Sequence, residues 1–183
     1  MSCPRSASPT NGRSEAATPA DPMATAARIG DRLWIGGAHA PLPQAVTVVV
    51  TLDDAAPPII TSGVTETRAP FPDSRWHPIA VEAATAAIRA AETGPDTGVL
   101  VRCRHGLNRS ALIAALVLVA QGTSPQDAID TICHARPGAL TNPYYVDLVR
   151  IWPADPMRDQ GCAALEATQH RPTIPTRTGD GAC

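Results

Sequence analysis

Short runs of apolar residues alternate along the chain with longer segments in which apolar residues recur at helical spacing. The runs at residues 32–37, 46–52 and 98–101 predict strands. A run that is apolar throughout is typical of a strand that is covered on both faces. A further short strand is predicted at residues 64–68. These four strands are the candidates for one central sheet.

Four segments of the chain predict helices. They are residues 81–93, residues 111–120, a segment that begins at Ser124-Pro125, and a segment from Asn142-Pro143 to Trp152. Ser124 and Asn142 are residue types that accept a hydrogen bond from a free N–H of the first turn, and the proline after each of them fits that turn. The segment 111–120 is apolar on all sides, as expected for a buried helix.

The interleaving of strands and helices predicts an α/β fold, with a central, mostly parallel, twisted sheet flanked by helices. Because strands and helices interleave and residues 46–52 are nearly all apolar, we expect helices on both faces of this sheet. One domain is predicted over residues 26–153. Residues 1–25 are rich in Ser, Pro, Thr and Ala, and residues 154–183 are rich in Pro, Thr and Gly. We therefore expect a disordered N-terminal tail and a flexible C-terminal tail.

Composition and charge narrow the class of protein. The 183 residues carry a formal net charge of −2, so no general basic field indicates nucleic acid as a partner. The apolar stretches are too short to cross a bilayer, which argues against a membrane partner. The five cysteines are Cys3, Cys103, Cys133, Cys162 and Cys183. Their odd number and their spacing predict neither a disulfide framework nor a metal site, so a reduced compartment, the cytoplasm, is the expected location.

The most informative segment runs from Cys103 to Ser110, between a predicted strand and the predicted helix 111–120. A tight loop between a strand and a helix N-terminus gathers backbone N–H groups and binds anions. Arg109, six residues after Cys103, can hold phosphate oxygens with two parallel N–H groups. The same field favours a thiolate at Cys103, so the pattern indicates a nucleophile aimed at phosphorus.

This segment resembles the phosphate loop of the cysteine-dependent protein phosphatases, the protein-tyrosine phosphatase superfamily, and the short chain is most similar to their dual-specificity branch. The resemblance implies a dual-specificity phosphatase-like fold and a phosphocysteine formed on Cys103. It also implies that Ser110 hydrogen-bonds the sulfur and helps it to leave. The residues that it assigns to phosphate binding are Arg104, His105, Gly106, Leu107, Asn108 and Arg109. No metal or cofactor is implied, because the thiolate, the arginine and the loop amides take its place.

One residue departs from the family pattern. The family usually has His directly before the cysteine, and this chain has Arg102. A cation in this place would still favour a thiolate. The prediction therefore keeps Cys103 as the nucleophile and leaves its degree of activation open.

The mechanism also needs an acid that gives the leaving oxygen a proton. Phe71-Pro72-Asp73 lies thirty residues before Cys103 and resembles the mobile Trp-Pro-Asp loop of the family, with Phe in place of Trp. Asp73 is therefore the predicted acid, and its carboxylate would next activate water against the phosphocysteine. Asp53 and Asp54 are the rival acids, although carboxylates that follow a strand more often cap or solvate its end.

Three further residues are candidates for positioning substrate or water. Asn142 lies in a segment that resembles the family's flank of the phosphate loop, where it would position water or only cap the following helix. Arg136 would contact an anionic substrate or stabilise the C-terminus of its own helix. His39 would lie at the rim of the pocket or be an ordinary exposed loop residue.

The predicted function is hydrolysis of phosphotyrosine in phosphorylated proteins, with phosphoserine and phosphothreonine left open. Two enzymes of the same fold are alternatives. The run from His105 to Ser110 is similar to the His-Gly-Phe-Asn-Arg-Thr motif of RNA 5′-triphosphatases, and a basic loop also suits a phosphoinositide phosphatase. Asp73 and the lack of a basic stripe argue against the RNA enzyme. A non-catalytic phosphate-binding module would normally have lost Cys103 or Arg109, and this chain keeps both.

Overall fold

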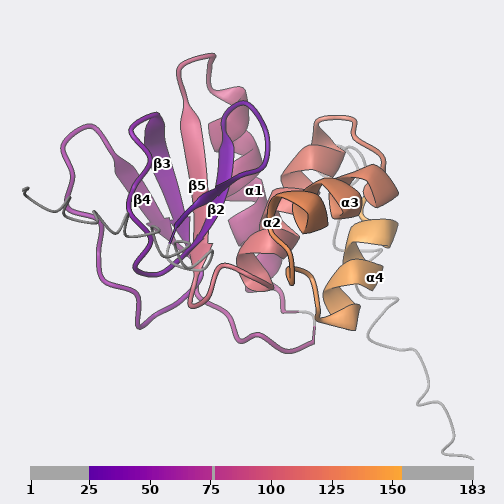
Figure 1. Cartoon of the computed structure of the whole chain (residues 1–183). Coiled ribbons are helices and arrows are strands. Elements are labelled where there is room, and N and C mark those ends of the chain that lie inside the picture. The colour runs from indigo at the N-terminus through magenta and orange to yellow at the C-terminus, as the bar shows by residue number, and fades with distance from the viewer. Residues whose placement is uncertain (1–24, 76, 154–183) are drawn as a thin grey trace, which may run out of the picture.

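The computed structural model describes residues 25–75 and 77–153. Apart from Thr25, both predicted tails lie outside the described residues. Five strands form one sheet in the order β1-β2-β5-β3-β4 within the described part (Figure 1). The strands are β1 (Ala27–Arg28), β2 (Leu33–Gly37), β3 (Val46–Thr51), β4 (Thr65–Arg68) and β5 (Gly98–Cys103). The four predicted strands are confirmed, and β1 was not predicted because two residues carry no periodic pattern.

The central strand of the sheet is β5, which pairs in parallel with β2 on one side and with β3 on the other. β4 continues the parallel sheet beside β3, and β1 runs antiparallel to β2 at the opposite edge. The mostly parallel sheet is therefore confirmed. Cys103 pairs with Gly37, so β2 and β5 end at the same level. This edge of the sheet carries the candidate site.

Four helices follow in the described part of the chain. They are α1 (Ile79–Glu92), α2 (Arg109–Ala120), α3 (Pro125–Ala135) and α4 (Pro143–Ile151). Ser124 and Asn142 cap α3 and α4 as predicted, since their side chains accept the N–H groups of Asp127 and Tyr144. α1 and α2 pack on the sheet, and α3 and α4 pack against α2. None of the helices in the described ranges is long and apolar enough to cross a membrane.

All four described helices lie on the same side of the sheet (Figure 1), so the prediction of helices on both faces is wrong. The connections from β2 to β3 and from β3 to β4, residues 38–45 and 52–64, form loops instead of helices. Pro41 and Pro43 fall in the first of these connections, and proline within a helix removes a hydrogen bond and clashes with the preceding turn. The sheet therefore has a helix side and a loop side.

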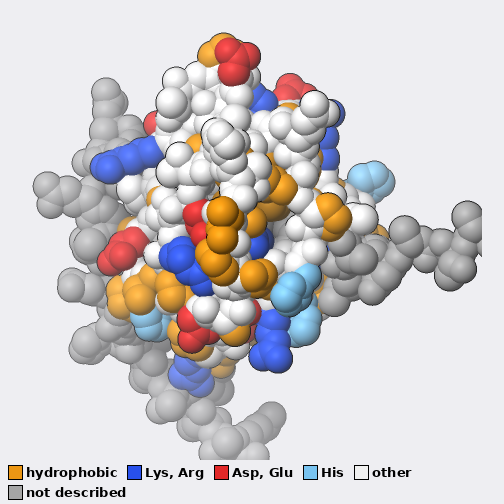
Figure 2. Space-filling model, turned by 90° about the vertical axis from the view of Figure 1, so that its left-hand side faces the viewer, with side chains coloured by type: hydrophobic (Ala, Val, Ile, Leu, Met, Phe, Trp, Pro, Cys, Tyr) orange, Lys and Arg blue, Asp and Glu red, His pale blue; other side chains and the backbone are white. Residues whose placement is uncertain are grey.

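Successive side chains of β5 alternate between these two sides. Val99, Val101 and Cys103 belong to the large core under the helices. The smaller core on the loop side is formed by Trp34, Val46, Val49 and Leu100. Arg102 directly precedes Cys103 and faces the loop side. Figure 2, which views the molecule from the left-hand side of Figure 1, shows hydrophobic side chains flanked by charged ones.

Candidate active site

The predicted phosphate loop joins the end of β5 to the start of α2, at the carboxyl edge where parallel sheets bind ligands. Gly106 has a φ of 71°, which favours glycine. A Cβ at this position would lie 2.5 Å from the carbonyl carbon of Gly36, so a larger residue would collide with the end of β2. The N–H of Ala38 also donates to the carbonyl of Arg104 at 3.3 Å. These contacts fix the loop against β2.

The Cys103 side chain points to the helix side, and the residue is only 3% exposed. Its sulfur accepts a hydrogen bond from the Gly106 N–H at 3.3 Å and shares a hydrogen bond with the Ser110 hydroxyl at 3.4 Å. Ser110 is buried in the first turn of α2. The structure has the Cys103 S–H donating to the Ser110 hydroxyl. A thiolate at Cys103 can only accept, so it would have two donors, the Gly106 N–H and this hydroxyl.

The guanidinium group of Arg109 is held by acceptors from two other segments. Nη1 donates to the carbonyls of Leu52 at 2.6 Å and Phe71 at 2.8 Å, and Nη2 donates to Asp53 Oδ2 at 3.3 Å. Nε is buried without a hydrogen-bond partner among the described residues. An unpaired buried donor costs about 1–3 kcal/mol, so Nε is open to an acceptor that enters the loop.

The predicted acid loop lies beside the phosphate loop. Phe71 is buried at its start, and Asp73 is exposed. One oxygen of the Asp73 carboxylate accepts a hydrogen bond from the Asn108 amide at 3.1 Å, and the other accepts one from the Asn142 amide at 3.1 Å. Asn108 belongs to the predicted phosphate loop, so the structure places Asp73 beside the loop that carries Cys103.

Tyr145 supports the acid loop from α4. It is 1% exposed, and its hydroxyl donates to the Pro72 carbonyl at 3.2 Å. Burial, with the negative charge of Asp73 nearby, raises the pKa of Tyr145 well above its usual value. The hydroxyl therefore stays protonated and remains a donor to the loop.

The rival acids occupy different places. Asp53 is 6% exposed, its Oδ1 accepts the Ala55 N–H at 3.1 Å, and its Oδ2 is paired with Arg109. Asp54 is exposed. Because one oxygen of Asp53 accepts from Ala55 and the other is paired with Arg109, its place fits the orientation of Arg109 better than proton transfer.

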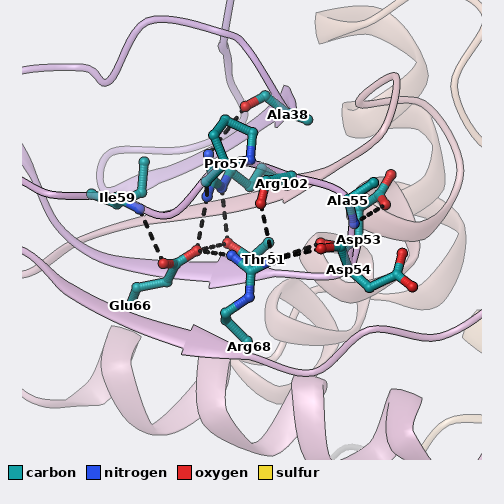
Figure 3. A network of polar contacts seen from close by, with 11 residues as sticks. Ala38, Thr51, Asp53, Asp54, Ala55, Pro57, Ile59, Glu66, Arg68 and Arg102 are labelled. Carbon is teal, nitrogen blue, oxygen red and sulfur yellow. Dashed lines mark hydrogen bonds and ion pairs between the residues drawn. The ribbon is translucent and has the colours of Figure 1, made fainter.

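Arg102 is 2% exposed and lies in a polar network on the loop side of the sheet (Figure 3). Its Nε donates to Thr51 Oγ1 at 2.8 Å, and its Nη1 donates to the Ala38 carbonyl at 3.1 Å. Its Nη2 donates to the Pro57 carbonyl and to the Glu66 carboxylate. The guanidinium thus ties β3, β4 and both loops to the central strand.

Glu66 balances the charge of Arg102 at a distance of 2.8 Å. Burial alone would raise the pKa of Glu66, but hydrogen bonds from Thr51, Ile59 and Arg102, with the arginine's charge, lower it to about 2. Glu66 is therefore ionised at neutral pH. The expectation that the charge of Arg102 favours a thiolate at Cys103 gains no support from these contacts, which all lie on the opposite side of the sheet.

The remaining candidate residues fall into two groups. Arg104 and His105 are exposed residues of the predicted phosphate loop, and His39 is exposed in the loop after β2. Arg136 is 4% exposed and donates to the carbonyls of Thr25 at 2.8 Å and His105 at 3.3 Å. The buried Arg136 therefore holds the backbone of the predicted phosphate loop through the His105 carbonyl.

Sequence reasoning missed the supporting roles of Glu66, Tyr145 and Gly36. Gly36-Gly37 at the end of a strand was a local signal, because glycine there often marks a close approach of another backbone. Glu66 and Tyr145 act through contacts with distant segments, and no local pattern indicates those contacts.

The chain matches no protein-family model and no curated protein. It is similar to the crystal structure of a mouse putative dual specificity phosphatase complexed with zinc tungstate, with 25% identity over 82% of this chain and 97% of that chain and a TM-score of 0.64. Human DUSP28 is 23% identical over 79% of this chain and 95% of its own, with a TM-score of 0.58. PTPMT1, solved in complex with PI(5)P, is 18% identical over 75% of this chain and 99% of its own, with a TM-score of 0.59.

These structures define the class of fold. This chain has the fold of the cysteine-dependent protein-tyrosine phosphatase superfamily. Within that superfamily, its fold is that of the dual-specificity branch, as the phosphate loop predicts.

Proposed function

We propose that this protein is a cysteine-dependent phosphomonoester hydrolase that acts on phosphotyrosine in proteins, with phosphoserine and phosphothreonine as further substrates to be tested. The observation that carries the proposal is the meeting of three groups at one edge of the sheet. The sulfur of Cys103 lies in the phosphate loop, Arg109 keeps a free Nε there, and Asp73 is hydrogen-bonded to the same loop through Asn108.

The first step transfers the phosphoryl group to sulfur. The Cys103 thiolate attacks phosphorus, the bond to the leaving oxygen breaks, and protonated Asp73 gives that oxygen its proton. Arg109 and the loop N–H groups hold the three other oxygens, where negative charge is spread in the transition state.

The second step releases phosphate. The Asp73 carboxylate takes a proton from water, the water oxygen attacks phosphorus, and the sulfur leaves as a thiolate. The Ser110 hydroxyl, 3.4 Å from the sulfur, donates to it as it leaves. Asp73 then carries the proton that it took from water and Cys103 is again a thiolate, so the enzyme has returned to its starting state.

The test is hydrolysis of para-nitrophenyl phosphate and of a phosphotyrosyl peptide in chelator and reductant. Cys103→Ser should abolish turnover, and Asp73→Asn should reduce it by about 10²- to 10⁴-fold, the usual size of general acid–base catalysis. Asp96→Asn is the matched control, because Asp96 is an exposed carboxylate in the turn before β5, at the other end of that strand. Wild-type turnover that survives Cys103→Ser would refute the proposal.

The Asp73→Asn variant also distinguishes the proposed phosphomonoesterase from an RNA 5′-triphosphatase. Triphosphorylated RNA carries a less basic leaving group, so an RNA 5′-triphosphatase should lose little activity in Asp73→Asn. The hydrogen bond between Asp73 and Asn108 favours the monoesterase, because it holds the acid next to the phosphate loop. A phosphoinositide is assayed in parallel, since Arg104 and His105 are exposed in the predicted phosphate loop.

The proposal includes a reducing location such as the cytoplasm. Cys103 has to remain a free thiol, as it is in this structure. Oxidised glutathione should therefore inactivate the protein, and reductant should restore it.

A further inference from the structure

Asn108 joins three segments that are far apart in the sequence. Its Nδ2 donates to Asp73 Oδ2 at 3.1 Å, while its Oδ1 accepts the Thr141 N–H at 3.0 Å and the Thr141 hydroxyl at 3.1 Å. The Asn142 N–H also points to this oxygen at 3.4 Å. One side chain of the phosphate loop therefore contacts both the acid loop and the turn before α4.

The orientation of the Asn108 amide is determined by these neighbours. Backbone N–H groups can only donate, so the amide atom that faces Thr141 and Asn142 has to be the oxygen. The NH₂ group is then left to face Asp73. Three consecutive N–H groups of the turn before α4 face the phosphate loop. The Leu140 N–H donates to the Leu107 carbonyl at 3.1 Å, and the next two face Asn108 Oδ1.

Asn142 repeats the same arrangement from the other side of the carboxylate. Its Oδ1 caps α4 by accepting the Tyr144 N–H at 3.1 Å. Its Nδ2 therefore faces the acid loop, where it donates to Asp73 Oδ1 at 3.1 Å and to the Ser74 carbonyl at 2.8 Å. The helix cap thus gives this amide its direction.

The backbone of the connecting turn is strained. Leu140 has a φ of 54°, a conformation that costs a residue with a side chain about 1–2 kcal/mol. Such strain persists where the surrounding contacts impose it. Here the hydrogen bonds from the N–H groups of Leu140 and Thr141 to residues of the phosphate loop are those contacts.

We propose that Asn108 is a positioning residue that ties the acid loop to the phosphate loop and sets the place of the Asp73 carboxyl group. The inference rests on the proposed function, since it assigns Asp73 a proton to deliver. A carboxylate has about four lone-pair sites, so the two amide donors leave a site for the proton that passes to the leaving oxygen. Asn142 donates to the other oxygen of the carboxylate, Asp73 Oδ1.

The proposal predicts a dependence on the leaving group that a purely structural role would not produce. A basic leaving group needs the proton from Asp73, and a weakly basic one leaves with little help. Asn108→Ala should therefore lower kcat/KM for phenyl phosphate, whose leaving group is as basic as tyrosine, by about 10- to 100-fold. The loss for para-nitrophenyl phosphate should be several-fold smaller.

A double-mutant cycle with Asp73→Ala identifies the route of the effect. If Asn108 acts through Asp73, then Asn108→Ala should change neither substrate by more than about twofold in the Asp73→Ala background. Thr141→Val is the matched control, because it removes one hydrogen bond to Asn108 Oδ1 and leaves Asp73 untouched. It should keep the wild-type ratio between the two substrates.

A second readout does not depend on activity. Arg75 is an exposed residue of the acid loop, so trypsin cleavage after it reports how firmly the loop is held. Asn108→Ala should speed this cleavage several-fold relative to cleavage after Arg89, an exposed residue of α1, and Thr141→Val should not.

Three results would overturn the proposal. They are an equal loss for both substrates, an undiminished effect in the Asp73→Ala background, and unchanged cleavage after Arg75. If wild-type protein shows no turnover that depends on Cys103, the proposed function fails, and the cleavage assay alone decides whether Asn108 holds the acid loop.

Discussion

Asp53 and Arg109 form an ion pair beneath the phosphate loop, with 3.3 Å between Oδ2 and Nη2, and both side chains are largely buried. The two terminal nitrogens of the guanidinium donate to Asp53 and to the carbonyls of Leu52 and Phe71. Nε is left without a hydrogen-bond partner among the described residues. Arg109 is thus held in one orientation, and under the proposed function this preorganisation lowers the cost of binding phosphate.

Asp53→Ala should lower kcat/KM by about 10- to 100-fold, because a guanidinium that has lost its partner no longer holds one orientation. The shape of the pH–rate profile should not change, since Asp73 remains the acid. Asp54→Ala, at the exposed neighbouring position, is the control and should behave as wild type. Loss of the basic limb of the profile in Asp53→Ala would instead identify Asp53 as the acid.

The Arg102–Glu66 pair should contribute to stability in a defined pH range. The pKa of Glu66 is lowered from 4.5 to about 2, so the contribution is fully present above pH 4.5 and is lost as the pH falls from 4.5 to 2. A shift of this size corresponds to about 3 kcal/mol. Chemical denaturation of wild type and Glu66→Gln should show a difference in the free energy of unfolding that narrows over this range. A constant difference down to pH 2 would contradict this assignment.

Arg102→His, which installs the residue usual in the family, should not increase activity. The smaller side chain cannot reach both the Ala38 and Pro57 carbonyls and would lose the buried ion pair with Glu66, which would keep only the partly exposed Arg68 as a charged partner; the expected loss is about 3 kcal/mol. The measurement compares kcat and the free energy of unfolding in the same preparations. A variant that is faster and equally stable would show that the arginine limits activation of Cys103.

Gly106→Ala should abolish turnover with the fold intact. The added Cβ would collide with Gly36 in a backbone conformation that already disfavours alanine, so the loop has to move away from Cys103. Circular dichroism checks the fold, and binding of vanadate checks the anion site. Gly30→Ala, at a position with open space around it, is the control and should bind vanadate normally.

Tyr145→Phe should loosen the acid loop by removing one hydrogen bond to the Pro72 carbonyl. The expected loss is about 1 kcal/mol in the free energy of unfolding, with a several-fold fall in kcat for phenyl phosphate. Since the ring stays buried, unchanged kcat for phenyl phosphate would contradict a role of this hydroxyl in holding the acid loop.

The sequence was sufficient to predict the strands of the central sheet, the caps of α3 and α4, and the place of Cys103 at the end of β5. These features depend on local patterns of apolar residues and on capping residues that act within one turn. The side of the sheet on which the helices pack was predicted wrongly. A buried strand shows that both faces are covered, but it does not show whether a helix or a loop covers them.

The supporting contacts of the site could not be predicted for a different reason. Glu66 is drawn to Arg102 from another strand, and Asn108 meets Asp73 across thirty-five residues of chain. Exposed or charged residues carry no periodic signal that gives their partners. Only the three-dimensional fold shows that an arginine in the place of the family's histidine has become part of the sheet's support.

The loop side of the sheet has an unusual closure. In most parallel sheets a helix covers the second face, and the side chains of that helix pack against the sheet. Here the guanidinium of Arg102, on the central strand β5, donates hydrogen bonds to the main-chain carbonyls of Ala38 and Pro57 in the two covering loops. These hydrogen bonds depend on where the two carbonyl groups lie, and every residue type has a carbonyl group. This contact therefore depends on the length of the two loops and not on the side chains of Ala38 and Pro57, so an insertion or deletion between β2 and Ala38, or between β3 and Pro57, should break it.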